Sequence, residues 1–378
     1  VECASFARVV VAEAYDAGAG HVTVIWADDA VTRLAYEHVE KSYFGQTPEW
    51  KRIQLDSLAQ DGACFIFIEG ADPAALKGID PAKPAAASKA RNTQCKIFRR
   101  GLDYNINPWC IAGAPVVAWA REVFPGDADE VAIYKLWIAI LHTARADGQD
   151  PESDWELHDA AFEKNLRFLN ENRFDCLRYT ASNGTDLVIG MTKGHEWAGG
   201  KGETPDGHPF FPNIPTEEVF TAPHKDKVDG IVYGTKPYVF NGQLIKNFHV
   251  TFKDGKVVEH GADEGADLLG QLLDTDEGAR HIGEVALVPA SSPINRSGKL
   301  FYNTLFDENA ACHIAFGDSY PGTTVGGTGL SKEELAARGM NHSSLHEDVM
   351  IGAEDSRITG KCRDGRTVPL FENGVWVL

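Results

Sequence analysis

Helical patterns alternate with short apolar runs over the first 175 residues, and this alternation constrains the fold more than any other feature. Apolar residues recur at helical spacing over 6–17, glycines follow, and the run 21–27 then predicts a buried strand. A second helical pattern at 31–43 precedes another strand-like run at 64–69. Helices that alternate with strands build parallel sheets, because a parallel connection needs a crossover. We therefore expect an N-terminal α/β domain with a mainly parallel sheet.

The pattern changes near residue 175. Before it, a helical stretch at 71–100, a strand-like run at 109–114 and two long helical patterns at 131–145 and 154–170 continue the alternation. After it, short β-rich runs are separated by turn signals such as Asn183-Gly184, which is typical of hairpins. The sequence therefore predicts an N-terminal α/β domain over 1–175 and a mixed α+β domain over 176–378.

Composition excludes several classes of protein. The formal charge of −19 and the lack of any basic run argue against nucleic acid, since phosphate binding depends on clustered Lys and Arg. No apolar stretch approaches the ~20 residues of a membrane-spanning helix. The seven cysteines are scattered and form no CxxC pair, which favours a reducing compartment, so we expect a cytoplasmic protein. Because the sequence starts at Val1 and enters a helical pattern almost at once, we expect that the true N-terminus is missing.

A glycine-rich stretch at 322–329 precedes a helical pattern at 331–338, where a helix N-terminus can hold a phosphate. The stretch lacks both the spacing of a dinucleotide-binding loop and the GK[ST] ending of a P-loop. A plain loop or a loop that lines a substrate site is therefore the better interpretation.

Histidines and carboxylates in unusual settings give a better signal. His346 and Asp348 precede the apolar run 349–351, so a strand that begins at His346 projects both side chains from one face, where they can share a metal ion. The alternative is a histidine capped by a nearby carboxylate at a strand end. His313 lies in a segment of small and apolar residues, where a neutral core histidine is the default.

Two glutamates belong to the same pattern. Glu284 is a lone carboxylate inside the strand-like run 283–289, and burying an unpaired carboxylate costs several kcal/mol, so such a residue usually meets a cation. An arginine partner is the alternative. Glu217 and Glu218 lead into another apolar strand, for which a solvated turn is the alternative.

Five segments carry a resemblance to a known family. They are NGTDL at 183–187, NIPTEEVFTAP at 213–223, GEVALVP at 283–289, LFDENAACHIAFGDSYP at 305–321 and GMNHSSLHEDVMIG at 339–352. Together they resemble the thermophilic-type metalloaminopeptidase family, the family of aminopeptidases T and S. The first half is also similar, so the resemblance covers nearly the whole chain.

The resemblance implies a site, an activity and an assembly. The implied metal ligands are Glu218, Glu284, His313, His346 and Asp348, and Tyr320 lies beside them. Glu218 and Tyr320 are the residues expected to act in catalysis, the second domain is expected to carry the active site, and the assembly is expected to be a homodimer. Three carboxylates and two imidazoles suit two divalent ions such as Zn²⁺ or Co²⁺ better than Mg²⁺ or Ca²⁺.

The primary hypothesis is a metal-dependent aminopeptidase that hydrolyses peptides with a free N-terminus, using a water activated by two metal ions. Glu217, Asp318 and Glu347 are the candidates to bind the substrate amine, and the sequence does not choose among them. The alternative is a non-catalytic metal- and ligand-binding protein with one structural ion. A nucleotide-dependent enzyme is a third interpretation.

Overall fold

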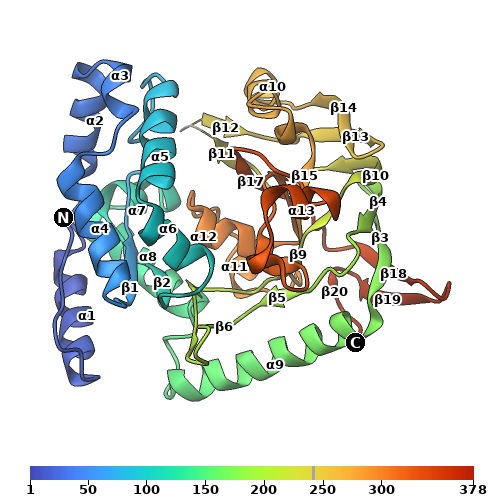
Figure 1. Cartoon of the computed structure of the whole chain (residues 1–378), viewed down its shortest axis with the longest axis horizontal. Coiled ribbons are helices and arrows are strands. Elements are labelled where there is room, and N and C mark those ends of the chain that lie inside the picture. The colour runs from blue at the N-terminus through green and yellow to red at the C-terminus, as the bar shows by residue number, and fades with distance from the viewer. Residues whose placement is uncertain (241–242) are drawn as a thin grey trace. The chain divides into compact units, whose positions relative to one another are not determined.

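The computed structural model describes residues 1–240 and 243–378 (Figure 1). The chain divides into two compact units: 1–147 with 201–214, and 148–200 with 215–378. Helix α9 (Pro151–Asn172) falls in the second unit, where it contacts β5 (Ala198–Gly199) and β9 (Val219–Thr221). The first division point therefore precedes α9, whereas the change in sequence pattern near residue 175 follows it. The division into domains 1–175 and 176–378 stays a prediction.

The first unit combines helices with a small parallel sheet. Strands β1 (Phe65–Glu69), β2 (Trp109–Gly113) and β8 (Asn213–Ile214) are paired in that order, and both pairings are parallel. The remaining elements are α1 (Ala4–Asp16), α2 (Asp29–His38), α3 (Lys41–Phe44), α4 (Glu49–Gln60), α5 (Ala82–Gln94), α6 (Lys96–Asp103), α7 (Val117–Val123), α8 (Asp129–Thr143) and the hairpin of β6 (Gly202–Glu203) with β7 (Pro209–Phe210). The predicted α/β architecture with a parallel sheet is confirmed.

The strand predicted at 21–27 is wrong. These residues form no regular element, and most are exposed, including Trp26 at 49%. A strand needs a neighbour that pairs with its backbone. Within the described part of the chain, β1 pairs with β2 and no strand pairs with 21–27, so the β-forming sequence has no ladder to join.

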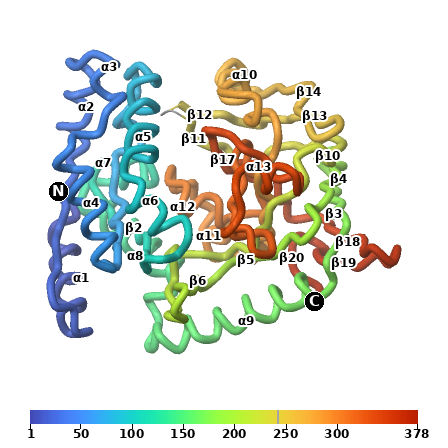
Figure 2. The backbone as a smooth tube through the Cα atoms, viewed as in Figure 1, coloured from blue at the N-terminus to red at the C-terminus, as the bar shows by residue number. Residues whose placement is uncertain are grey.

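The second unit contains two larger sheets (Figure 2). One has eight strands in the order β14-β13-β10-β4-β3-β18-β19-β20, and the other has five in the order β17-β16-β15-β9-β5. Strand bounds are β3 (Phe174–Thr180), β4 (Asp186–Met191), β10 (Pro223–Tyr233), β13 (His249–Lys253), β14 (Lys256–Gly261), β15 (Ile282–Leu287), β16 (His313–Gly317), β17 (His346–Met350), β18 (Arg357–Cys362), β19 (Thr367–Glu372) and β20 (Val375–Trp376). The smaller elements are β11 (Tyr238–Phe240), β12 (Gln243–Ile245), α10 (Ala266–Leu273), α11 (Pro293–Arg296), α12 (Thr304–Asp307) and α13 (Lys332–Ala337). This is the mixed α+β architecture predicted for the second half.

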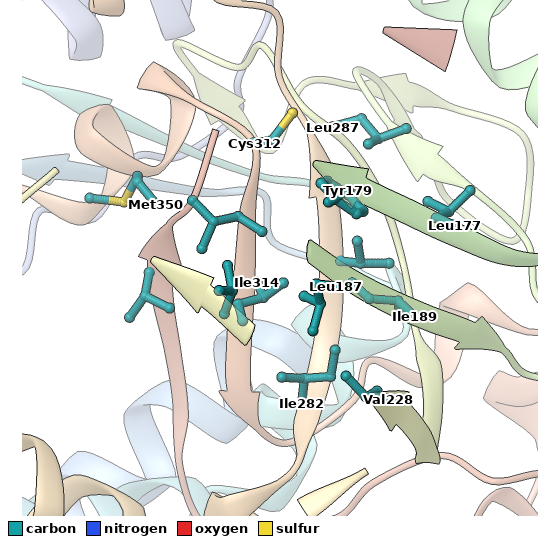
Figure 3. Close-up of a cluster of buried hydrophobic side chains, with 14 of the residues drawn as sticks. Leu177, Tyr179, Leu187, Ile189, Val228, Ile282, Leu287, Cys312, Ile314 and Met350 are labelled. Carbon is teal, nitrogen blue, oxygen red and sulfur yellow. The ribbon is translucent and has the colours of Figure 1, made fainter. Parts of the chain in front are cut away.

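An apolar core lies between these two sheets (Figure 3). Leu187 and Ile189 from β4 meet Ile282 and Ile314 from β15 and β16, and all four are fully buried. Because side chains alternate along a strand, the core uses one face of the five-stranded sheet and leaves the other face for different residues. None of the helices in the described residues is both long and apolar enough to cross a membrane.

Candidate metal centre

The register of three neighbouring strands gathers the predicted ligands on one face of the five-stranded sheet. Glu284 on β15 lies opposite Ala315 on β16, and Ala315 lies opposite Asp348 on β17. The small side chain of Ala315 leaves room between the two carboxylates. His313 lies two residues before Ala315 on β16, and His346 lies two residues before Asp348 on β17. Both histidines therefore project from the same face of the sheet as Asp348. Glu218 directly precedes the neighbouring strand β9.

The side-chain atoms converge closely. His313 Nε2 lies 3.0 Å from Glu218 Oε2 and 3.6 Å from Glu284 Oε1. His346 Nε2 lies 3.6 Å from Asp348 Oδ1 and 3.9 Å from Glu284 Oε2. The atoms form two groups able to hold a metal ion, Glu218-Glu284-His313 and Glu284-His346-Asp348, and Glu284 belongs to both. Its two carboxylate oxygens face different histidines, which is the arrangement of a bridging ligand.

The donor atoms fit a cation better than they fit one another. His313 is 1% exposed and Glu284 4%. Glu218 Oε2, His313 Nε2 and Asp348 Oδ1 are buried, and although the first two lie 3.0 Å apart, none of the three makes a hydrogen bond of good geometry. Because buried polar atoms are normally satisfied, this cluster of two carboxylate oxygens and one imidazole nitrogen fits a set that binds a cation. Nitrogen and oxygen donors of this kind suit Zn²⁺ or Co²⁺.

The electrostatics of the cluster point the same way. Burial alone would lower the pKa of His313, but the carboxylates of Glu218 and Glu284 raise it well above its ordinary value. His346 is also desolvated, yet Asp348 raises its pKa to about 10. Burial raises the pKa of Glu284 to about 7. Protons on the histidines thus provide the positive charge that the carboxylates require, and a metal ion would replace these protons.

Backbone carbonyls orient both imidazoles. His346 Nδ1 donates to the Asp318 carbonyl at 2.9 Å, and His313 Nδ1 donates to the Ala311 carbonyl at 3.2 Å. Each contact fixes the ring and directs Nε2 into the cluster, as is usual for metal-binding histidines.

Tyr320 lies beside the cluster. Its ring centroid is 4.8 Å from that of His346 and 6.2 Å from that of Phe220. The residue remains 46% exposed, so a molecule that approaches the cluster from solvent can reach it.

The structure places the three residues proposed to bind the substrate amine in different surroundings. Glu347 lies opposite Phe316, whose ring is 6.4 Å from Phe252 of the larger sheet. Glu347 therefore faces the core side of the sheet, away from the cluster, and is wrong as a candidate. The Asp318 carboxylate accepts from the Ser343 backbone N–H and lies 2.8 Å from His342, while Glu217 is buried next to Glu218.

Glu308 was missed by the sequence analysis. It lies on the short 3₁₀ turn Glu308–Ala310, five residues before His313. Burial raises the pKa of its carboxyl well above the ordinary value, and the charges of Glu218 and Asp348 raise it further. A fourth carboxylate thus adjoins the cluster. In the sequence, Glu308 is one of several acidic residues in the segment 305–321, and no strand periodicity marks its position.

The glycine-rich stretch leads into α13, as predicted, but the N-terminus of that helix is already capped. Ser331 Oγ accepts from the Glu334 backbone N–H, and the Glu334 carboxylate accepts from the Ser331 N–H. This capping box engages two of the N–H groups that a phosphate at the start of the helix would use, which weakens the nucleotide interpretation.

A buried cluster of carboxylates and imidazoles on the strands of an α+β unit defines a protein with a candidate metal site. Residues 1–376 match the model of the family described as thermophilic metalloprotease (M29). The chain is 43% identical over 371 residues to aminopeptidase AmpS of Bacillus subtilis, covering 98% of this chain and 90% of that one. It is 40% identical to aminopeptidase T of Thermus aquaticus over 378 residues, covering 100% and 92%.

A solved structure agrees. Wild-type AmpT from Thermus thermophilus superposes with a TM-score of 0.92 at 39% identity, covering 100% of this chain and 92% of that one. This chain belongs to the thermophilic metalloprotease (M29) family, which confirms the resemblance found in the sequence.

Metal binding should release protons. At pH 7 the metal-free site holds His346, with a pKa of about 10, and His313, with a pKa well above the ordinary value, in their protonated forms. A metal binds neutral imidazole and ionised carboxylate, and Glu284, with a pKa of about 7, is about half protonated at pH 7. We therefore expect roughly two to three protons to be released per chain, and affinity to fall as the pH falls. Calorimetric titration of Zn²⁺ into chelator-treated protein, in buffers with different ionisation enthalpies, measures this number. A release near zero would contradict protonated histidines.

Proposed function

We propose that this chain is a metal-dependent aminopeptidase that uses two divalent ions, Zn²⁺ or Co²⁺, to remove N-terminal residues from peptides. The observation that carries the proposal is the pair of ligand groups that share Glu284. A single closed structural ion needs about four ligands and no shared carboxylate. The geometry and the family thus favour an enzyme over a non-catalytic protein with one structural ion.

The proposed ligand roles follow the two groups. Glu218 and His313 serve one ion, His346 and Asp348 serve the other, and Glu284 bridges them. When bound, two such ions lower the pKa of a shared water and polarise the scissile carbonyl. Glu308, whose carboxyl adjoins both groups, is proposed as a further donor or as a group that holds a proton beside Asp348.

Tyr320 is proposed to act on the substrate. Its half-exposed phenol stands over His346, where it can donate a hydrogen bond to the carbonyl oxygen as that atom gains charge. A role as a metal ligand is the alternative. For the substrate amine, Glu217 and Asp318 remain the proposed acceptors. The homodimer and the cytoplasmic location are proposals that rest on the family resemblance and the cysteine content.

The activity itself is tested with matched free and N-acetylated peptides. We expect hydrolysis of the free peptide, loss of activity after chelation, and recovery with Co²⁺ or Zn²⁺, because both ions suit the same donors. The acetylated peptide should be a poor substrate, since it lacks the charged amine. Activity that survives complete metal removal would contradict a metalloenzyme, and equal turnover of both peptides would indicate an endopeptidase.

The shared carboxylate should matter to both ions. Glu284→Gln removes the charge that both groups use, so bound metal should fall by more than one ion per chain, whereas His346→Ala should affect mainly one. Metal analysis after gel filtration measures both variants. Glu259→Gln, at an exposed position on β14, is the control and should keep full metal content. Full stoichiometry in Glu284→Gln would show that the site is elsewhere.

Tyr320→Phe separates the two roles of the phenol. If Tyr320 stabilises the oxyanion, kcat should fall on the order of 10²–10³, the loss typical of one oxyanion donor, with metal content unchanged. If it is a ligand, metal content should fall too. Both quantities are measured on one preparation, with Tyr134→Phe, exposed on α8, as the control. Wild-type kcat with full metal would remove Tyr320 from the mechanism.

A further inference from the structure

A cavity of about 290 Å³ opens in the second unit, apart from the metal cluster. Its wall includes Val288 after β15, the segment 310–312 before β16, Gly352 after β17 and Phe371 on β19. None of the residues that line it belongs to the two metal-binding groups. Its volume lies at the small end of ligand pockets, which suits a molecule smaller than a typical drug.

Two opposite charges stand on this wall. Lys236 and Glu354 both line the cavity, yet no ion pair or hydrogen bond engages the Lys236 ammonium within residues 1–240 and 243–378. Burial lowers the pKa of Lys236, and the negative charges of Asp307 and Glu354 offset this only in part. A half-buried ammonium without a direct acceptor is stabilised when an anion binds to it.

The other walls are apolar or already engaged. Among the apolar residues of the lining, Ala290 and Ala353 are partly exposed, whereas Val288, Ala310 and Phe371 are buried. The Asn295 amide donates to the Ala290 carbonyl, and the Thr235 hydroxyl donates to the Gly352 carbonyl. The ligand must therefore carry its charges at one end and a small apolar body at the other.

We propose that this cavity binds a free α-amino acid with a small apolar side chain. Its carboxylate pairs with Lys236, its ammonium pairs with Glu354, and its side chain packs against the partly exposed Ala290 and Ala353. A dianion such as phosphate fits less well, because the carboxylates of Asp307 and Glu354 lie near Lys236 and repel a second negative charge. The proposed aminopeptidase reaction would supply such a ligand as product, but the binding itself does not depend on that reaction.

The cavity also adjoins the metal site through the backbone. Ala311 lines the cavity, and its carbonyl accepts from His313 Nδ1. Cys312 also lines the cavity, and it directly precedes His313 in the sequence. A ligand in the cavity thus contacts the segment that orients one imidazole of the metal cluster without occupying the cluster.

The test titrates L-alanine into the metal-loaded protein by calorimetry and compares it with N-acetyl-L-alanine, which has the carboxylate but no ammonium. We expect the wild type to bind L-alanine and to bind the acetylated compound at least tenfold more weakly. Lys236→Met should lose one binding site for L-alanine, Lys236→Arg should retain it, and Glu354→Gln should weaken it. Lys256→Met on β14 is the exposed control.

Hydrolysis of a free aminoacyl substrate is measured on the same preparations, because the metal centre can also bind an amino acid. Lys236→Met should keep kcat/KM within about twofold of wild type, which separates the cavity from the catalytic site. Unchanged L-alanine binding in Lys236→Met, or equal binding of the acetylated compound, would overturn the proposal. Absence of hydrolysis by the wild type would refute the proposed function. The calorimetric result would still decide whether the cavity binds an amino acid.

Discussion

The second unit depends on compensation of negative charge on one face of its five-stranded sheet. Glu218, Glu284 and Asp348 converge there with the imidazoles of His313 and His346, and Glu308 adds a fourth carboxyl. Buried like charges repel one another strongly in a low-dielectric setting. The raised pKa values of His346 and Glu284 show how the protein meets this condition without metal, since protons take the place of cations. Repulsion among these carboxylates makes an unfavourable contribution to the free energy of the folded protein, and metal binding would reduce it.

The scaffold holds this cluster because the opposite face of the same strands is anchored in the core. Ile314 and Phe316 alternate with His313 and Ala315, so β16, which carries the proposed ligand His313, is held by apolar contacts between the two sheets. Two glycines permit the tight backbone packing at the strand ends. A Cβ on Gly317, which has φ of 102°, would lie 2.1 Å from the Leu345 carbonyl oxygen, and one on Gly283 would lie 2.1 Å from that of Asp318. The glycines that flank the acidic and histidine positions in the sequence are therefore part of the site's construction.

Much of this arrangement could be predicted from the sequence, because strand periodicity carries information about faces. The spacing of His346 and Asp348 alone predicts that both lie on one face, and the setting of Glu284 as a lone carboxylate in an apolar run points to a nearby cation. Glu308 could not be recognised from the sequence as part of the cluster, because it lies on a 3₁₀ turn, where no period of two relates it to the strands. The strand predicted at 21–27 failed for a different reason: local β propensity is present, but pairing is a tertiary property, and within the described residues no partner strand lies beside it.

Glu347 shows how one residue of offset changes the chemistry of a carboxylate. It stands between two proposed ligands in the sequence, yet the pleat directs it to the core side, where burial raises its pKa to about 8. At neutral pH it is therefore mostly protonated and adds little negative charge to the strand. Asp348, on the other face, has its pKa held below the ordinary value by His346 despite its burial, and it stays ionised. Adjacent acids thus take opposite protonation states because they face different surroundings, and only the ionised one is positioned to bind a cation.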